Sequence, residues 1–190
     1  MAATEIPFAK SPRVQAAQLV VAGLITGFLT PLAAAFTDHF HIFRATGGLS
    51  LTLGGVPFAL LVVLIARRVS RSDWWRPAAL GAVTLVAFEI AITVAANTSM
   101  ALTGRPEPIR NILGGLAGGF VGSGLMVLAA LLLRLGARRV ARWLPMLVVG
   151  TGAGMLLAVD SYLRSDWVWV LFPVWQASVA LLLTRALKSS

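Results

Sequence analysis

Cysteine is absent from this chain of 190 residues. Its absence excludes disulfide bonds, thiolate nucleophiles and metal sites with cysteine ligands. Charged side chains are also scarce. They make up 12% of the residues, about half of the roughly 25% that is usual in soluble domains. We infer that most of the molecular surface does not face water.

Histidine occurs only twice, at His39 and His41, both before the second long apolar run. A serine is a weak nucleophile without an adjacent base, and Ser123 lies much later in the chain, between two glycines. Asp38 and the two histidines form a metal-like cluster, but a solvated loop also produces this pattern. We therefore assign no catalytic residue, no metal site and no cofactor, and we do not expect an enzyme.

Long apolar segments dominate what remains. Hydrophobic residues make up 58% of the chain, and the mean hydropathy is +0.85. Most of the apolar runs have the length of roughly 18 to 24 residues that spans a bilayer core as a helix. We predict an all-α fold, a polytopic integral membrane bundle that forms a single membrane domain over residues 1–190. The six expected transmembrane helices cover residues 14–37, 48–66, 78–100, 111–133, 144–159 and 167–184.

Basic residues are distributed unequally between the two sides that this arrangement defines. Twelve of the 16 Lys and Arg residues fall on the side that carries both termini: Lys10, Arg13, Arg67, Arg68, Arg71, Arg76, Arg134, Arg138, Arg139, Arg142, Arg185 and Lys188. The other side has four: Arg44, Arg105, Arg110 and Arg164. Because cytoplasmic loops retain Lys and Arg, both termini are predicted to be cytoplasmic, in a bacterial inner membrane.

The net charge of +9 would indicate nucleic acid in a soluble protein. Here the charges fall at helix ends, so we expect the lipid bilayer as partner and no nucleic acid. Tryptophans also flank the spans and are expected to anchor at the interfaces: Trp74, Trp75 and Trp143 inside, Trp167 and Trp169 outside. Asp160, at the outer end of the fifth span, is expected to pair with an outer arginine.

Two features of this arrangement have alternative interpretations. The basic N-terminus, the first apolar run and the alanines at 33–35 also fit a cleaved signal peptide, although the run is long for one. Residues 66–77 and 137–145 share an Arg-rich stretch followed by Trp and Pro. This similarity indicates either parallel helical-hairpin repeats, as in some transporters, or convergence of two cytoplasmic loops on the same residue types.

Glu89 is the most informative polar residue inside an expected span. It lies about eleven residues from each end of the third span, hence about 16 Å along the axis and near the bilayer midplane. Thr93 and Asn97 follow at i+4 and i+8 and share its helix face. One interpretation is a proton or cation path, because a carboxylate at that depth is costly. The other is a neutral side chain that hydrogen-bonds a neighbouring helix.

The first span has a polar face of its own, which includes Thr26 and Thr30 beside Pro31. Such a face is expected to point into the bundle, because lipid offers no hydrogen-bond partners, and it could meet the face of Glu89. Threonines in membrane helices also commonly bond their own backbone. The proline is expected to bend the helix.

Glycine is concentrated in the fourth span as overlapping G-x-x-x-G pairs. These pairs allow close helix packing, either within the chain or between protomers of a homo-oligomer or larger membrane complex. The residues are Gly114, Gly115, Gly118, Gly119 and Gly122.

Two functional classes fit the sequence. The first is a structural or accessory membrane subunit that organises a complex through its glycine-rich faces. The second is a small proton-linked transporter or channel in which Glu89 titrates and Thr93, Asn97, Thr26 and Thr30 extend the path. We prefer the first, because the sequence contains no recognisable catalytic constellation.

Overall fold

The computed structural model describes residues 11–40, 53–70, 73–163 and 168–188, with the side chains of 37–40 left aside. All regular elements in these ranges are helices, which confirms the predicted all-α class for the described part of the chain. In order they are α1 Pro12–Phe40, η1 Leu53–Gly55, α2 Val56–Val69, α3 Trp75–Ala101, α4 Glu107–Leu132, η2 Val140–Arg142, α5 Leu144–Ala153, α6 Leu156–Tyr162 and α7 Leu171–Lys188.

Four segments are long and apolar enough to cross a membrane: Pro12–Phe36, Trp75–Ala101, Glu107–Leu132 and Val140–Tyr162. Large apolar side chains on the outside of α1, such as Val21, Ile25 and Phe28, are about half exposed. Apolar surface of this extent is unusual on a water-soluble monomer. The helices thus indicate a membrane protein. The second and sixth expected spans correspond to α2 and α7, of 14 and 18 residues.

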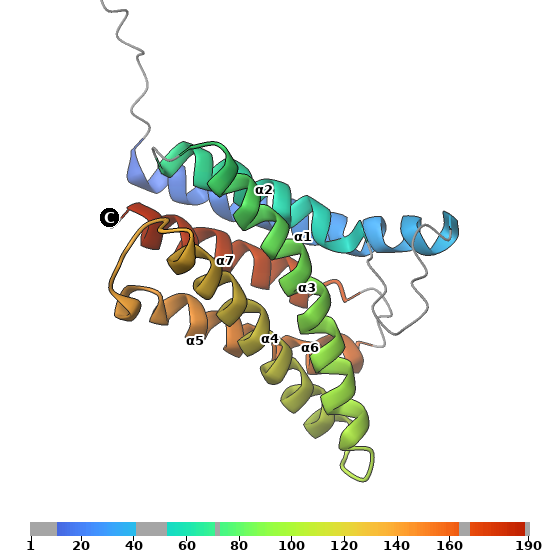
Figure 1. Cartoon of the computed structure of the whole chain (residues 1–190). Coiled ribbons are helices and arrows are strands. Elements are labelled where there is room, and N and C mark those ends of the chain that lie inside the picture. The colour runs from blue at the N-terminus through green and yellow to red at the C-terminus, as the bar shows by residue number, and fades with distance from the viewer. Residues whose placement is uncertain (1–10, 41–52, 71–72, 164–167, 189–190) are drawn as a thin grey trace, which may run out of the picture.

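Successive long segments run back and forth along one bundle, so that α1 begins and α7 ends at the same end (Figure 1). There the Lys188 ammonium donates to Gln15 Oε1 at 2.8 Å. The C-terminal end of α2 and the connection between α4 and α5 lie at this end too. We call it the basic end, because most of the described Lys and Arg residues belong to these segments. Arg105 and Arg110 belong to the α3–α4 turn at the opposite end.

The glycines of α4 allow two neighbours to approach closely. On one face, a Cβ atom added at Gly118 would lie 2.6 Å from the carbonyl oxygen of Ala91 in α3. On the other face, a Cβ atom at Gly119 would lie 2.6 Å from the carbonyl oxygen of Gly150 in α5, and Gly115 meets Gly154. Any larger residue at these positions would force the helices apart. Both glycine rows are therefore used for packing within the chain.

A second close contact joins α1 to α7. Gly23 and Gly27 of α1 leave no room for a Cβ atom, because the backbones of Ala177 and Pro173 lie directly against them. This G-x-x-x-G pair was not singled out in the sequence, where the richer pattern of α4 drew attention. It positions the C-terminal helix, which otherwise has the least apolar character of the long segments.

The fifth expected span is not one continuous helix. It ends as α5 at Ala153 and resumes as α6 at Leu156. The Gly154 and Met155 amides donate to the carbonyls three residues before them, at 3.0 and 3.1 Å, which marks a tight turn. Glycine is a poor helix former, and Gly154 also meets Gly115, so the break coincides with the closest approach of α4.

Trp143 does not anchor at a membrane interface as expected from the sequence. Its side chain is 1% exposed, and its Nε1 donates to the carbonyl of Ala137 at 2.9 Å. It packs in the core because the connection between α4 and α5 folds back against α7, where the Ala137 amide donates to Ala186. By contrast, Trp74 is 72% exposed, which suits an interfacial position.

Candidate functional site

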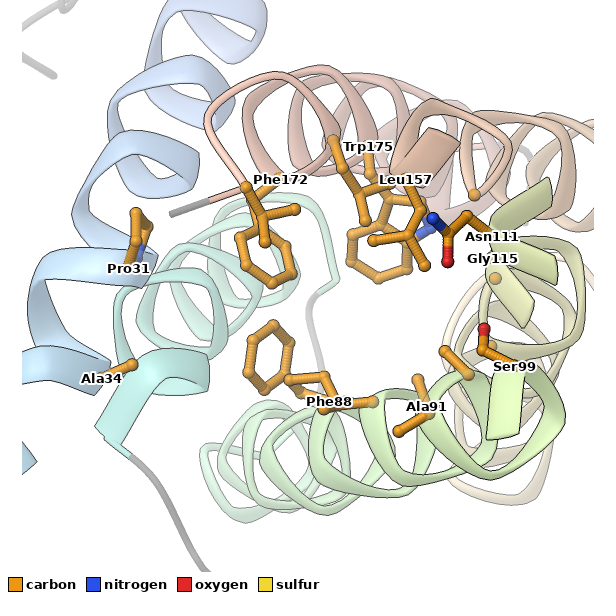
Figure 2. Close-up of a pocket in the computed structure, with 18 of the residues that line it drawn as sticks. Pro31, Ala34, Phe88, Ala91, Ser99, Asn111, Gly115, Leu157, Phe172 and Trp175 are labelled. Carbon is orange, nitrogen blue, oxygen red and sulfur yellow. The ribbon is translucent and has the colours of Figure 1, made fainter. Parts of the chain in front are cut away.

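A half-open pocket of about 730 Å³ lies between α1, α3, α4, α6 and α7. Figure 2 shows its walls: Pro31 and Ala34 come from α1, Phe88 and Ala91 from α3, and Phe172 from the start of α7. The volume is in the range of roughly 300 to 1,000 Å³ that is usual for small-molecule sites. Most of the lining is apolar. We call this space the central cavity.

Three aromatic side chains form one wall of the central cavity. The rings of Phe88 and Phe172 lie with their centroids 5.4 Å apart, tilted by 40°. Trp175 is held in place twice, because its ring makes an edge contact with Phe58 at 5.4 Å and its Nε1 donates to the carbonyl of Gly150 at 3.0 Å. Such aromatic contacts and a buried hydrogen bond fix side-chain orientation. This wall is preorganised.

Small residues create the space opposite. Gly115, Gly118 and Gly119 of α4 line the central cavity, as do Ala91 and Ala95 of α3. The close approach of α3 to α4 requires small residues at these positions. Larger side chains there would fill the volume. The same small residues thus allow the close helix packing and leave the space of the cavity.

Polar groups gather at one place on the wall. Figure 2 shows Ser99 and Asn111 across the central cavity from Phe88 and Phe172. Asn111 Nδ2 donates to Ser161 Oγ at 2.7 Å, and Ser99 Oγ donates to the carbonyl of Arg110 at 3.1 Å. Ser99 lies near the end of α3 and Asn111 near the start of α4, so this polar group belongs to the end of the bundle opposite the basic end.

Asp160 closes the same end of the bundle. It is 1% exposed, and its two carboxylate oxygens accept the amides of Val170 and Leu171, each at 2.9 Å. A carboxylate at a helix N-terminus satisfies amides that lack partners in the helix and opposes the helix dipole. Asp160 thus caps α7. Two of the outer arginines that it was expected to meet, Arg44 and Arg164, lie outside the described residues. Through Leu171, which lines the central cavity, this cap helps to shape the site.

Glu89 lies beside the central cavity and is not among the residues that line it. Its side chain is 6% exposed, although the neighbouring Phe88 reaches the cavity. Thr93 Oγ1 donates to the backbone carbonyl of Glu89 at 2.9 Å, so the hydroxyl proton of Thr93 is used within its own helix. Asn97 is exposed. The three residues of the expected path therefore have different surroundings.

Thr26 and Thr30 both bond the backbone of α1, and Thr30 also contacts α7. Thr26 Oγ1 donates to the carbonyl of Gly23, and Thr30 Oγ1 donates to the carbonyl of Thr26, both at 3.1 Å. Thr30 also accepts a hydrogen bond of 2.7 Å from Gln176 Nε2 in α7. The polar partner of Thr30 thus comes from α7, whereas the sequence raised the face of Glu89 as the candidate.

Gln176 is the buried polar residue that the sequence analysis missed. It is fully buried, and its Oε1 has no hydrogen-bond partner within the described part of the structure. An amide in the middle of an apolar run is a detectable signal, because polar groups at membrane depth are costly. Ser123 Oγ is likewise buried and unpartnered among the described residues, against Gly150.

The Asp38, His39 and His41 cluster falls outside the side chains that the structure describes. Within the described residues, no group of three or more His, Cys, Asp or Glu side chains is placed to hold a metal ion. Comparison with known proteins returns no match, whether with a family model, a curated protein or a solved structure.

Proposed function

We propose that the chain is a six-span protein of a bacterial cytoplasmic membrane, with both termini in the cytoplasm. The arrangement of α1, α2, α3, α4, the α5–α6 pair and α7 supports six passes, because each long segment reverses the direction of the one before it (Figure 1). The gathering of Lys and Arg at the basic end supports the orientation. The shorter α2 and α7 cross the membrane in contact with longer neighbours.

Within that membrane, the proposed role is that of a non-catalytic accessory subunit whose bundle holds an apolar molecule. One observation carries this proposal: the 730 Å³ central cavity, lined by preorganised aromatic rings and by the backbone of tightly packed glycines. The volume lies in the range that is usual for small-molecule sites, and the walls are mostly apolar. The tight packing of α4 on both faces supports a rigid frame around the cavity.

Native mass spectrometry of the protein, extracted gently from its own membrane, tests this role. The expected spectrum contains the chain with a bound species of defined mass. In Ala34→Trp, the indole would occupy the central cavity, and the bound species should be lost. Ala17→Trp is the matched control, because Ala17 lies on the same helix at an exposed position outside the cavity. A bare chain in all three samples, with no bound molecule, would contradict the proposal.

The burial of Glu89 supports a second candidate, a small proton-linked transporter or channel. A carboxylic acid that is buried in a membrane helix is a functional-site hypothesis by default. In proteoliposomes with an imposed pH gradient, this candidate predicts a proton flux that Glu89→Gln abolishes while the thermal unfolding curve stays unchanged. Loss of folding with Glu89→Gln, or the same flux in both proteins, would assign Glu89 a structural role.

A further inference from the structure

We propose that the central cavity binds one acyl chain of a glycerolipid, taken from the leaflet on the side opposite the basic end, with the ester region of that lipid beside Asn111. This inference rests on the proposed function and names the class of molecule that the cavity would hold. It commits to a lipid of the surrounding bilayer, in preference to a water-soluble ligand or a side chain of another protein.

The length of the central cavity matches one leaflet. Along α3 it extends from Phe88 to Ser99, both of which line it. Eleven residues of helix rise about 16 Å at 1.5 Å per residue. The hydrocarbon core of a bilayer is about 30 Å thick, so one leaflet contributes about half of that. An acyl chain that starts at the polar end would finish near the aromatic wall.

The chemistry of the lining changes in the same direction. The deep part presents Phe88, Phe172 and Trp175, which offer apolar and polarisable surface to methylene groups. The other part presents Ser99 and Asn111 near the helix ends. A glycerolipid has the same polarity profile, with apolar chains joined to polar esters. The charged residues of the described chain do not contribute to this lining.

Asn111 has hydrogen-bonding capacity for an ester. Its amide carries two N–H groups and a carbonyl oxygen. The bond to Ser161 Oγ at 2.7 Å uses one N–H and fixes the orientation of the amide. Ser161 is itself held, because its Oγ donates to the carbonyl of Leu157 at 3.0 Å. The second N–H is then available for the carbonyl oxygen of a lipid ester.

The central cavity is open to its surroundings. Ile92 lines the central cavity and is nevertheless 40% exposed, and Ala96, one turn later, also lines it and is exposed. Side chains that line a closed cavity would be buried, so the exposure of these two shows that the cavity is open. Since the exposed outer faces of these helices are apolar, the opening faces the hydrocarbon of a membrane. Lipid acyl chains are the main component of that region.

Photocrosslinking with a diazirine-labelled lipid tests the inference. The full-length protein would be placed in nanodiscs of phosphatidylethanolamine and phosphatidylglycerol that contain a small fraction of lipid with a diazirine midway along one acyl chain. Peptide mass spectrometry would then locate the crosslinks. We expect them on the segments that contain Phe88 and Phe172. In Ala34→Trp their yield should fall at least about tenfold, the change that a loss of 1.4 kcal/mol in binding produces; Ala17→Trp should match the parent.

Ala96→Trp provides a second variant in case Ala34→Trp fails to fold, because Ala96 lines the cavity and is exposed. Its crosslink yield on the segments that contain Phe88 and Phe172 should also fall. Crosslinks confined to outward residues such as Val21 and Phe28, with yields that neither cavity variant changes, would overturn the lipid assignment. If native mass spectrometry still showed a bound species of another mass, the proposed function would stand and only the lipid would be rejected. If neither experiment showed an occupant, both would fail.

Discussion

The cap that Asp160 places on α7 offers a stringent test of how the end of the bundle is held together. Both carboxylate oxygens accept backbone amides, those of Val170 and Leu171, at 2.9 Å, and the side chain is 1% exposed. Hydrogen bonds to a charged group contribute about 1.5 to 3 kcal/mol each. Asp160→Ala removes both bonds and leaves two amides without partners, so the free energy of unfolding should fall by about 3 kcal/mol or more.

This loss is large enough to measure by thermal unfolding. For a chain of 150 to 250 residues, 1 kcal/mol corresponds to about 2 to 4 °C in Tm, so Asp160→Ala should lower Tm by at least about 6 °C. Asp160→Asn retains one acceptor oxygen but loses the charge and sets an NH2 group against the second amide, so it should recover less than half of this loss. Tryptophan fluorescence in nanodiscs reports the transition, and Trp169 lies next to the capped amides in sequence.

The matched control is Asp73→Ala, which removes an exposed acid near the basic end. Its effect should stay within about 0.5 kcal/mol, as is usual for surface positions. An Asp160→Ala protein that melts within about 2 °C of the parent would refute the reasoning, because the two hydrogen bonds would then contribute nothing to the fold.

The remaining predictions concern packing and topology. Gly118→Ala should destabilise the bundle by about 1 to 3 kcal/mol through overpacking against the Ala91 carbonyl. Gly152→Ala, where a Cβ atom meets open space, should be neutral or stabilising by up to about 1 kcal/mol. Equal Tm values for the two variants would contradict the close packing of α3 against α4. Because the chain lacks cysteine, single introduced cysteines report on which side of the membrane a residue lies. A membrane-impermeant maleimide should label Gly104→Cys in intact cells and Ser11→Cys only after lysis. The reverse pattern would invert the proposed topology.

The all-α class could be predicted from the sequence because apolar runs of spanning length have few other structural solutions. The break between α5 and α6 could not. It coincides with the contact of Gly154 with Gly115, and the periodicity of the segment itself does not reveal a partner so far away in the chain. The burial of Trp143 escaped prediction because it depends on how the connection between α4 and α5 folds back against α7, where the Ala137 amide donates to Ala186.

Some residues of the candidate site could be predicted from the sequence, but the cavity that they line could not. The sequence singled out the glycines of α4, and the structure places Gly115, Gly118 and Gly119 on the wall of the central cavity. That these glycines border a space depends on which residues of α1 and α7 stand opposite, a tertiary property that no single segment encodes. An ionisable residue such as Glu89 is conspicuous in an apolar run, whereas Gln176, which is more deeply buried, is not ionisable.

The most direct test of the account is a single-particle density map of the protein in a lipid nanodisc. We predict elongated density in the central cavity that runs from the neighbourhood of Asn111 to the rings of Phe88 and Phe172, and that disappears in Ala34→Trp. A map in which the helices have closed on one another, so that side chains fill the space and no density remains between those rings, would contradict the claim that this bundle is built to hold an apolar molecule.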